Sequence, residues 1–434
     1  MNLLRKVLQA IPAGTELVVG GTVVLGAASY IQIAAAGYML PAVTLSAVSV
    51  LWSLTMSLSL GLFFPIEQEL TRAVAARVVR GEGAAPVLRR AAVLTVGLLA
   101  LIGAALWLSA AQIARLFFAG QESFVWAFAG ALAGMGLVFL TRGILAGLGI
   151  FRSYGISLAL DGGLRIVLAL GMALAGVHSA LAYAGVLTVA PLAAMLLTLP
   201  ATLRASHPGP PMPWSELSQN MGTLMCSSLL AQAVVNAAVL SVKLLSPAET
   251  ALVTALLNAG VLARVPLFVF GSLQPTLMTG LSTTATSGDR PAFRRMLVQT
   301  CAVVGGLGAL GGIPAVLLGP WLIRVLFHAP DVLGCLDFFW FSAGTLCYML
   351  AMVLGQALIA MRRHRLQLLS WVLGTGVLIG ITLAPGPLTT RVETAYAAGA
   401  LVTALTMLVA LVRSAGRRPQ PGGNTAPAST LENA

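Results

Sequence analysis

The sequence predicts an all-α polytopic membrane protein with twelve transmembrane helices in two six-helix, pseudo-symmetric lobes around a central cleft. Three observations predict it: the composition, the length of the apolar stretches and an internal repeat. Of the 434 residues, 58% are hydrophobic and only 9% are charged, and the mean hydropathy is +0.94. A soluble domain carries about 25% charged residues, so this composition indicates a membrane protein.

The apolar stretches have the length of membrane-spanning helices, which need about 20 mainly apolar residues each. The first stretch begins like a signal peptide, but Glu16 interrupts it and the run 17–36 is too long for a signal sequence. It is therefore taken as the first span. The expected spans are 13–37, 42–66, 91–111, 124–148, 154–177, 180–203, 217–241, 250–276, 296–319, 338–361, 366–384 and 394–413.

The positive charge is distributed as expected for a multi-pass protein. Eighteen of the 25 Lys and Arg residues fall in the N-terminus, alternate loops and the C-terminal tail. Only Arg115, Arg324 and Arg391 fall in the intervening loops. This asymmetry predicts that both termini lie in the cytoplasm, and the expected location is the bacterial cytoplasmic membrane. The net charge of +12 then reflects topology, and no nucleic-acid partner is expected.

The two halves of the chain resemble each other. Residues 81–90, 113–119 and 143–152 find counterparts in the same order at 288–295, 322–329 and 355–364, at a spacing of 205 to 212 residues. Six spans per repeat is an even number, so both halves share one orientation, which is typical of alternating-access transporters. The Phe-rich segments around Arg115 and Arg324 are predicted to be short interfacial helices.

A proline-rich segment divides the halves. Residues 204–216 include four prolines, which resist helix formation, so this segment is predicted to be an extended cytoplasmic linker. The predicted domains are a first lobe at 1–203, the linker at 204–216, a second lobe at 217–413 and a disordered tail at 414–434. The four cysteines lack metal-type spacing and are expected to be free.

Four cationic side chains lie within apolar stretches: Arg142, Arg165, Lys243 and Arg264. A charge at bilayer depth costs at least roughly 2.5–3.5 kcal/mol, so an excess of buried cations suggests an anionic cargo. Lys243 lies at a span end and can extend to the interface. Arg264 precedes Pro266, which would kink the helix, and has no acid within one turn. It is therefore predicted to face the cleft and bind an anion.

The other two arginines are less specific. Arg165 stands four residues after Asp161 on the same helical face, so an ion pair and a substrate-binding role both remain open. Arg142, past the centre of its span, can reach either the interface or a cavity. A guanidinium suits a phosphate because its planar fork makes bidentate hydrogen bonds.

Fewer acids accompany them. Glu16, Asp161 and Glu67 are the candidates for coupling or gating, and Glu69 and Arg72 can pair at i, i+3 as a gate. Buried amides such as Gln274 and Gln356 more commonly hold helices together. No phosphate-binding loop or metal-ligand cluster is found in the sequence, so the protein is not expected to be an enzyme or to hold a cofactor. A gradient of H+ or Na+, the membrane potential or the substrate gradient would supply the energy.

Three segments carry a family resemblance: 64–72, 141–147 with Arg152 and Tyr154, and 262–270. They resemble the multidrug/oligosaccharidyl-lipid/polysaccharide (MOP) exporter superfamily, and within it the Wzx-type polysaccharide flippases. The resemblance implies flipping of an isoprenoid pyrophosphate-linked sugar across the membrane, alongside polysaccharide biosynthesis proteins. It also implies that Arg142, Arg165 and Arg264 meet the pyrophosphate.

Three alternatives stay open. Related drug exporters of the MATE type are coupled to cations and generally use carboxylates in the cleft. In this chain, by contrast, the charged residues expected in the cleft are net basic. Related lipid II flippases usually have fourteen spans. A non-transporting scaffold would keep the fold and recruit partners through its loops and tail.

Overall fold

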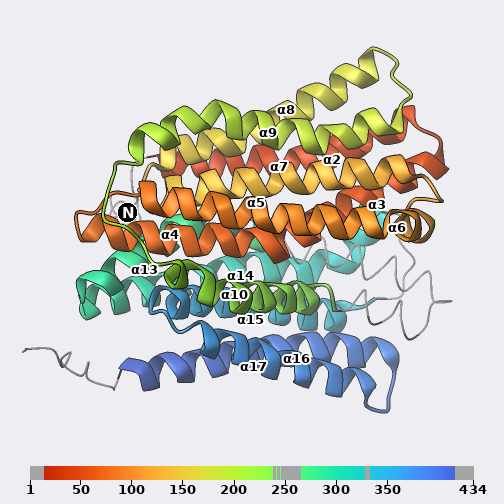
Figure 1. Ribbon diagram of the computed structural model, residues 1–434. Helices are drawn as coiled ribbons and strands as arrows, with labels where there is room; N and C mark the ends of the chain where they lie inside the picture. The colour runs from red at the N-terminus through yellow and green to blue at the C-terminus, as the bar shows by residue number, and fades with distance from the viewer. Residues whose placement is uncertain (1–13, 238–240, 242–244, 246–264, 328–332, 416–434) are drawn as a thin grey trace, which may run out of the picture.

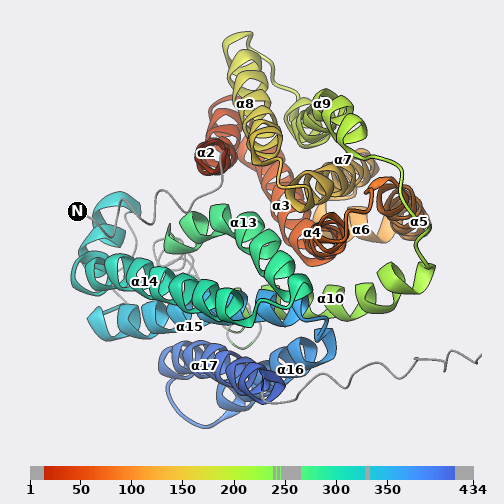
Figure 2. The ribbon, with the colours of Figure 1, turned by 90° about the vertical axis from the view of Figure 1, so that its left-hand side faces the viewer.

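The computed structural model describes residues 14–237, 241, 245, 265–327 and 333–415. Within these residues the regular elements are helices, and they form two groups (Figures 1 and 2). The first lobe contains α2 (Thr15–Met39), α3 (Ala42–Leu58), the π-helix η1 (Ser59–Phe63), α4 (Phe64–Val79), α5 (Ala85–Leu108), α6 (Ala110–Phe117), α7 (Glu122–Gly147), α8 (Phe151–Leu174) and α9 (Ala180–Ala205). The second contains α10 (Trp214–Val235), α13 (Val265–Ser287), α14 (Arg290–Phe327), α15 (Cys335–Ala360), α16 (His364–Leu383) and α17 (Leu388–Ala415).

Ten helices among the described residues are long and apolar enough to cross a membrane. Helix α10 covers most of the expected seventh span, whereas α13 overlaps only the second part of the expected eighth span, 250–276, and extends past it to Ser287; residues 250–264 lie outside the described residues. Each lobe has its own apolar core, around Phe124 and Leu132 in the first and around Phe338 and Trp371 in the second. Large apolar side chains such as Leu174 point outward and are exposed in the protein alone, as a lipid-facing surface requires.

Helices α2 and α8 pack closely because glycines line their contact. The Gly155 carbonyl oxygen lies only 2.5 Å from where a Cβ of Gly21 would stand. A Cβ on Gly162 would lie 2.6 Å from the Cα of Leu25. Small residues let backbones approach in this way in membrane helices, where dispersion contacts replace the hydrophobic effect as the driving force.

The second span differs from its predicted limits of 42–66. The helical path continues through η1 into α4 and ends at Val79, and residues 65–77 are all buried. Pro65 lies in the first turn of α4, where a missing backbone N–H is tolerated. The predicted Glu69–Arg72 pair is present, with two hydrogen bonds of 2.5 and 3.0 Å. The polar motif is thus satisfied inside the protein, which lets the helix extend.

The two predicted interfacial helices have different outcomes. Around Arg115 the short helix α6 is separate from α5. Around Arg324 the prediction is wrong, because α14 runs without a break to Phe327. Between α5 and α6 stands Ser109, whose hydroxyl bonds the Ala105 carbonyl oxygen and competes with the helical backbone. In the internal repeat Arg324 is the counterpart of Arg115, and the same offset makes Leu318 the counterpart of Ser109. Leucine is a good helix former, so the second copy lacks the residue that competes with the helix in the first.

The interlobe segment between α9 and α10 has no helix at residues 206–213. It is held against the first lobe: the Ala85 N–H donates to the His207 carbonyl at 3.1 Å, and Arg77 donates to the carbonyls of Gly83 and Pro210. Figure 1 shows this segment crossing one end of the bundle. We call this the arginine-rich end; α4, α7, α9, α13 and α15 end there.

Candidate functional site

A cavity of about 330 Å³ lies between the two lobes. Its walls are mainly apolar, and its polar residues come from both lobes. The first lobe contributes Thr22, Glu67, Gln68, Arg142 and Tyr154; the second contributes Ser227, Ser228, Gln232, Gln274, Gln356 and Gln367. An apolar cavity with a few convergent polar groups is the usual form of a small-molecule site.

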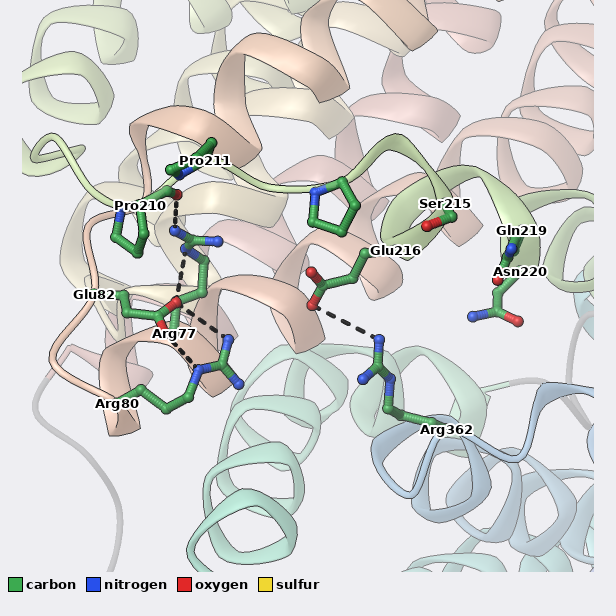
Figure 3. Close-up of a pocket in the computed structure, with 11 residues that line it drawn as sticks. Arg77, Arg80, Glu82, Pro210, Pro211, Ser215, Glu216, Gln219, Asn220 and Arg362 are labelled. Carbon is green, nitrogen blue, oxygen red and sulfur yellow. Dashed lines mark hydrogen bonds and ion pairs between the residues drawn. The ribbon is translucent and has the colours of Figure 1, made fainter. Parts of the chain in front are cut away.

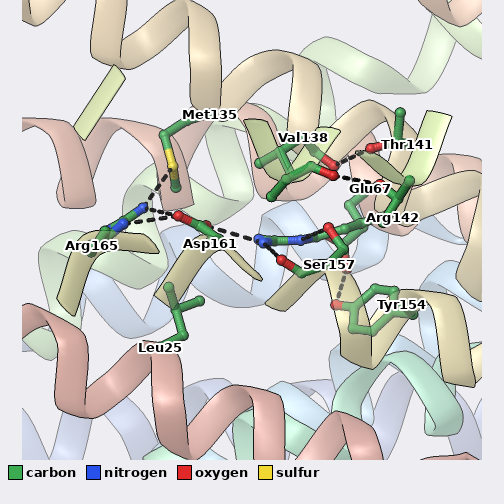
Figure 4. Close-up of polar contacts among 12 residues, drawn as sticks. Leu25, Glu67, Met135, Val138, Thr141, Arg142, Tyr154, Ser157, Asp161 and Arg165 are labelled. Atoms are coloured by element: carbon green, nitrogen blue, oxygen red, sulfur yellow. Dashed lines mark hydrogen bonds and ion pairs between the residues drawn. The ribbon is translucent and has the colours of Figure 1, made fainter. Parts of the chain in front are cut away.

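A buried charge cluster stands beside this cavity in the first lobe (Figure 4). Arg142 donates to Asp161 Oδ2 at 3.1 Å and to the hydroxyl and carbonyl of Ser157, both at 3.2 Å. Arg165 donates to Asp161 Oδ1 at 2.9 Å. The three charged side chains are at most 2% exposed. One carboxylate therefore serves two guanidinium groups, and the cluster alone carries one net positive charge.

A second carboxyl group lies nearby. The Tyr154 hydroxyl donates to Glu67 Oε1 at 2.7 Å, while Glu67 Oε2 is buried without a hydrogen-bond partner. Glu67 lines the cavity together with Arg142. When Glu67 is ionised, the four groups Arg142, Asp161, Arg165 and Glu67 sum to zero; when it is protonated, they sum to +1. Glu67 thus sets the charge that the first lobe presents to the cavity.

The structure brings together most of the sequence-predicted residues. The i, i+4 pair of Asp161 and Arg165 is present, and Arg142 joins it as a third member. Arg142 and Glu67 line the cavity, whereas Arg165 is not among its lining residues.

One predicted residue lies apart from this group. Glu16 is exposed at the start of α2, where it accepts a hydrogen bond from the Gly14 N–H. Arg264 and Lys243 lie outside the described residues, since α13 is described from Val265.

Several polar residues of the cavity carry little sequence signal. Both side-chain atoms of Gln356 and the oxygen of Gln367 are buried without hydrogen-bond partners. The sequence favoured Gln356 as a helix-to-helix contact; in the structure it lines the cavity instead. Tyr154 belongs to the segments that carry the family resemblance, whereas Gln367 has no such signal and lies within two turns of the loop at 361–363 that joins α15 to α16.

Below the cavity, toward the arginine-rich end, contacts join the lobes. Glu69 Oε2 on α4 lies 3.7 Å from His364 Nε2 on α16. The Thr279 hydroxyl on α13 donates to the Ala146 carbonyl on α7 at 2.8 Å. Farther up, Ser228 on α10 donates to the Leu60 carbonyl at 2.7 Å. Among the described residues, the approach of Glu69 to His364 and the Thr279–Ala146 hydrogen bond join the lobes at the arginine-rich end of the cavity.

Comparison with known sequences gives partial matches, and no protein-family model matches the chain. An uncharacterized protein of Mycobacterium tuberculosis is 35% identical over 161 residues, which is 37% of this chain and 36% of the relative. A second uncharacterized protein of that species is 28% identical over 291 residues, 65% of each chain. The same figures hold for an uncharacterized protein of Mycobacterium bovis. The chain therefore spans about one third to two thirds of these relatives.

Solved structures match over nearly the whole chain. A Vibrio cholerae MATE transporter, VcmN, superposes with a TM-score of 0.81 at 14% identity and covers 92% of this chain and 95% of its own. An outward-facing multidrug resistance MATE family transporter of the MOP superfamily gives a TM-score of 0.76 at 14% identity, over 93% and 95% of the two chains. The predicted fold class is confirmed. The chain has the two-lobed, all-helical membrane fold of the MATE transporters.

Proposed function

We propose that this protein is an alternating-access exporter that carries a lipid-linked saccharide across the cytoplasmic membrane. The observation that carries the proposal is the set of unpartnered polar atoms around the cavity: Gln356 Nε2 and Oε1, Gln367 Oε1 and Glu67 Oε2. Buried polar atoms without partners are costly and normally find a ligand or water. Amide and carboxyl groups that both donate and accept suit the hydroxyl groups of a sugar.

The charge of the site supports an anionic carrier for that sugar. Arg142 lines the cavity and is held in place by Ser157 and Asp161. A phosphate oxygen near Arg142 would accept a hydrogen bond from the same guanidinium group that donates to Asp161. Arg264, which lies outside the described residues, is the second arginine proposed to bind the pyrophosphate; Arg165 would act through Asp161.

Alternating access follows from the two lobes. In the described structure the lobes meet at the arginine-rich end through Glu69, His364, Thr279 and Ala146. If this end is cytoplasmic, as the arginine distribution predicts, the conformation is closed toward the cytoplasm. Cargo loading then requires these contacts to separate.

Protonation of Glu67 is the proposed coupling step. Its ionised form balances the charge of Arg142, Asp161 and Arg165, and its neutral form leaves a net positive charge for an anionic cargo. If a Na+ gradient or the membrane potential drives transport instead of protons, a group other than Glu67 carries the coupling. Replacing Glu67 with Gln fixes the neutral form.

A direct transport assay tests the proposal. Proteoliposomes would hold a fluorescent isoprenoid pyrophosphate-linked oligosaccharide, and the readout is the fraction accessible in the opposite leaflet. We expect Gln356→Ala and Arg264→Glu to reduce the rate at least tenfold, with Arg115→Glu on α6 as a charge-matched control. Normal flipping by Arg264→Glu would show that this arginine does not bind the cargo.

A second function has an observation in its favour. The carboxyl group of Glu67 faces the cavity, which also fits a cation-coupled exporter of drugs, and the similar structures include a multidrug resistance transporter. The same proteoliposomes separate the two. Efflux of a cationic dye that depends on Glu67, with no movement of the labelled lipid, would favour the drug exporter.

A further inference from the structure

A second pocket, of about 510 Å³, lies at the arginine-rich end, outside the central cavity (Figure 3). Its lining is mostly polar and comes from three separate parts of the chain. They are the end of α4 and the following turn, with Arg77, Arg80 and Glu82; the interlobe segment and the start of α10, with Pro210, Pro211, Pro213, Ser215, Glu216, Gln219 and Asn220; and Arg362. The pocket therefore bridges the two lobes.

The charges in this pocket are unevenly satisfied. Arg77 is 4% exposed and is engaged by the Gly83 and Pro210 carbonyl groups. Arg80 makes two hydrogen bonds to Glu82, at 2.9 and 3.3 Å, which hold the pKa of the Glu82 carboxyl below its usual value. Arg362 reaches Glu216 only at 3.7 Å and stays 55% exposed. Figure 3 shows Arg80, Glu216 and Arg362 directed toward the same space.

The backbone at Arg362 gives an independent observation. The turns α7–α8 and α15–α16 have the same hydrogen-bond pattern. In the first, Gly149 and Ile150 donate to Ala146 and Leu145. In the second, Arg362 and Arg363 donate to Ile359 and Leu358.

The residue at the left-handed position differs between these turns. It is Gly149 in the first lobe, with φ 72°, and Arg362 in the second, with φ 59°. Glycine is the favoured residue for such a helix end, and a side chain there is strained. The second lobe thus keeps an arginine where the fold favours glycine, and its guanidinium points into the pocket.

We propose that this pocket is a binding site for a phosphate group, held between Arg80 and Arg362. Phosphate oxygens accept charge-assisted hydrogen bonds from guanidinium groups, and basic pockets between helices at the cytoplasmic side are typical sites for anionic lipid headgroups. The amides of Gln219 and Asn220 offer further donors. Glu216 competes with the ligand for Arg362, and at 3.7 Å their contact is the longest of the three Arg–Glu pairs in the pocket.

Binding here has a consequence for the lobes. Arg80 belongs to the first lobe and Arg362 to the second, so a phosphate between them stabilises the arrangement in which the arginine-rich end is closed. The inference is independent of the cargo of the central cavity.

Thermal unfolding of the full-length protein tests the site. The midpoint would be measured in neutral detergent with inorganic phosphate against chloride at equal ionic strength, and in nanodiscs of neutral lipid with and without phosphatidylglycerol. We expect the midpoint to rise with at least one of these. A rise with inorganic phosphate identifies a free anion, and a rise only with phosphatidylglycerol identifies a lipid headgroup. No rise in either arm overturns the proposal.

Three variants make the test specific. Arg362→Gly suits the left-handed backbone, so it should fold, and it should weaken binding roughly tenfold or more. Arg365→Ala removes the same charge from the same turn region but not from the pocket lining, and should bind as the unmodified protein does. Glu216→Gln should strengthen binding, because the competing carboxylate is gone. Equal effects of Arg362→Gly and Arg365→Ala, or weaker binding by Glu216→Gln, would contradict the assignment.

Discussion

Glu69 on α4 and His364 on α16 face each other across the junction of the lobes, with 3.7 Å between Oε2 and Nε2. Both side chains are almost fully buried, at 0% and 1% exposure. On the other side of Glu69, Arg72 makes a bidentate ion pair. A single carboxylate thus stands between a buried arginine of its own lobe and a buried histidine of the other lobe, and only the arginine is hydrogen-bonded to it.

We predict that Glu69→Gln lowers the free energy of unfolding by about 3–5 kcal/mol, because the buried charge of Arg72 then loses its hydrogen-bonded ion-pair partner. The unfolding midpoint in detergent measures it. Glu82→Gln is the control: its pair with Arg80 lies at the exposed arginine-rich surface, where such pairs contribute little, and Arg77, 3.4 Å from Glu82, keeps its hydrogen bonds to the Gly83 and Pro210 carbonyls. Equal losses in the two variants would show that the Glu69 pair is no more important than a surface contact.

A second prediction concerns the shared carboxylate. Asp161→Asn leaves Arg142 and Arg165 without their counter-charge, so we expect a loss of at least about 3–5 kcal/mol. The double variant Asp161→Asn/Arg165→Gln removes one positive charge as well and leaves Arg142 beside Glu67. Its midpoint should recover part of the loss. A double variant that is no more stable than Asp161→Asn would mean that the charge balance is not what holds this cluster.

The sequence predicted the elements that depend on local patterns. Apolar length located the spans, and the i, i+4 spacing predicted the Asp161–Arg165 pair that the structure contains. Proline density placed the break at 206–213 between α9 and α10. These features depend on residues close together in the chain, where periodicity and propensity are informative.

The features that sequence reasoning missed depend on contacts between distant residues. The sequence shows no partner for Arg142 because Asp161 lies on the next helix, and a one-dimensional pattern does not show which faces of α7 and α8 meet. Gln356 and Gln367 look like ordinary core amides until the lobes are placed around a cavity. The helix α4 continues past residue 66 because Glu69 and Arg72 are buried together as a pair. In the sequence alone, these two residues look like part of a charged, surface-exposed stretch.

Cross-linking the two lobes should stop transport. The Thr279 hydroxyl lies 2.8 Å from the Ala146 carbonyl oxygen, so α13 and α7 are in direct contact there, and these two positions are chosen for a pair of cysteines. We expect the oxidised Ala146→Cys/Thr279→Cys protein, with its four native cysteines replaced, to lose transport and to regain it on reduction. Proteoliposome transport with and without reductant is the measurement.

The matched control for that cross-link joins two helices of the first lobe. A Cβ on Gly130 of α7 would lie 3.6 Å from the Cβ of Thr188 of α9, which suits a disulfide. The oxidised Gly130→Cys/Thr188→Cys protein should keep its transport, since these helices move together. Full transport by the oxidised cross-lobe variant would instead show that Ala146 and Thr279 need not separate.

The α2–α8 contact allows the closest comparison between two neighbouring positions. At Gly162 a Cβ would meet the Leu25 Cα at 2.6 Å and its nitrogen at 2.7 Å, whereas at Gly163 nothing lies within 4 Å. Gly162→Ala must therefore push α2 away from α8, and overpacking of this kind costs about 1–3 kcal/mol. Gly163→Ala should be neutral or stabilising by up to about 1 kcal/mol, because alanine favours the helix. Both variants have the same composition and differ by one position, so the unfolding midpoints report on the packing alone. If Gly162→Ala is as stable as Gly163→Ala, the two helices do not approach as closely as this contact requires.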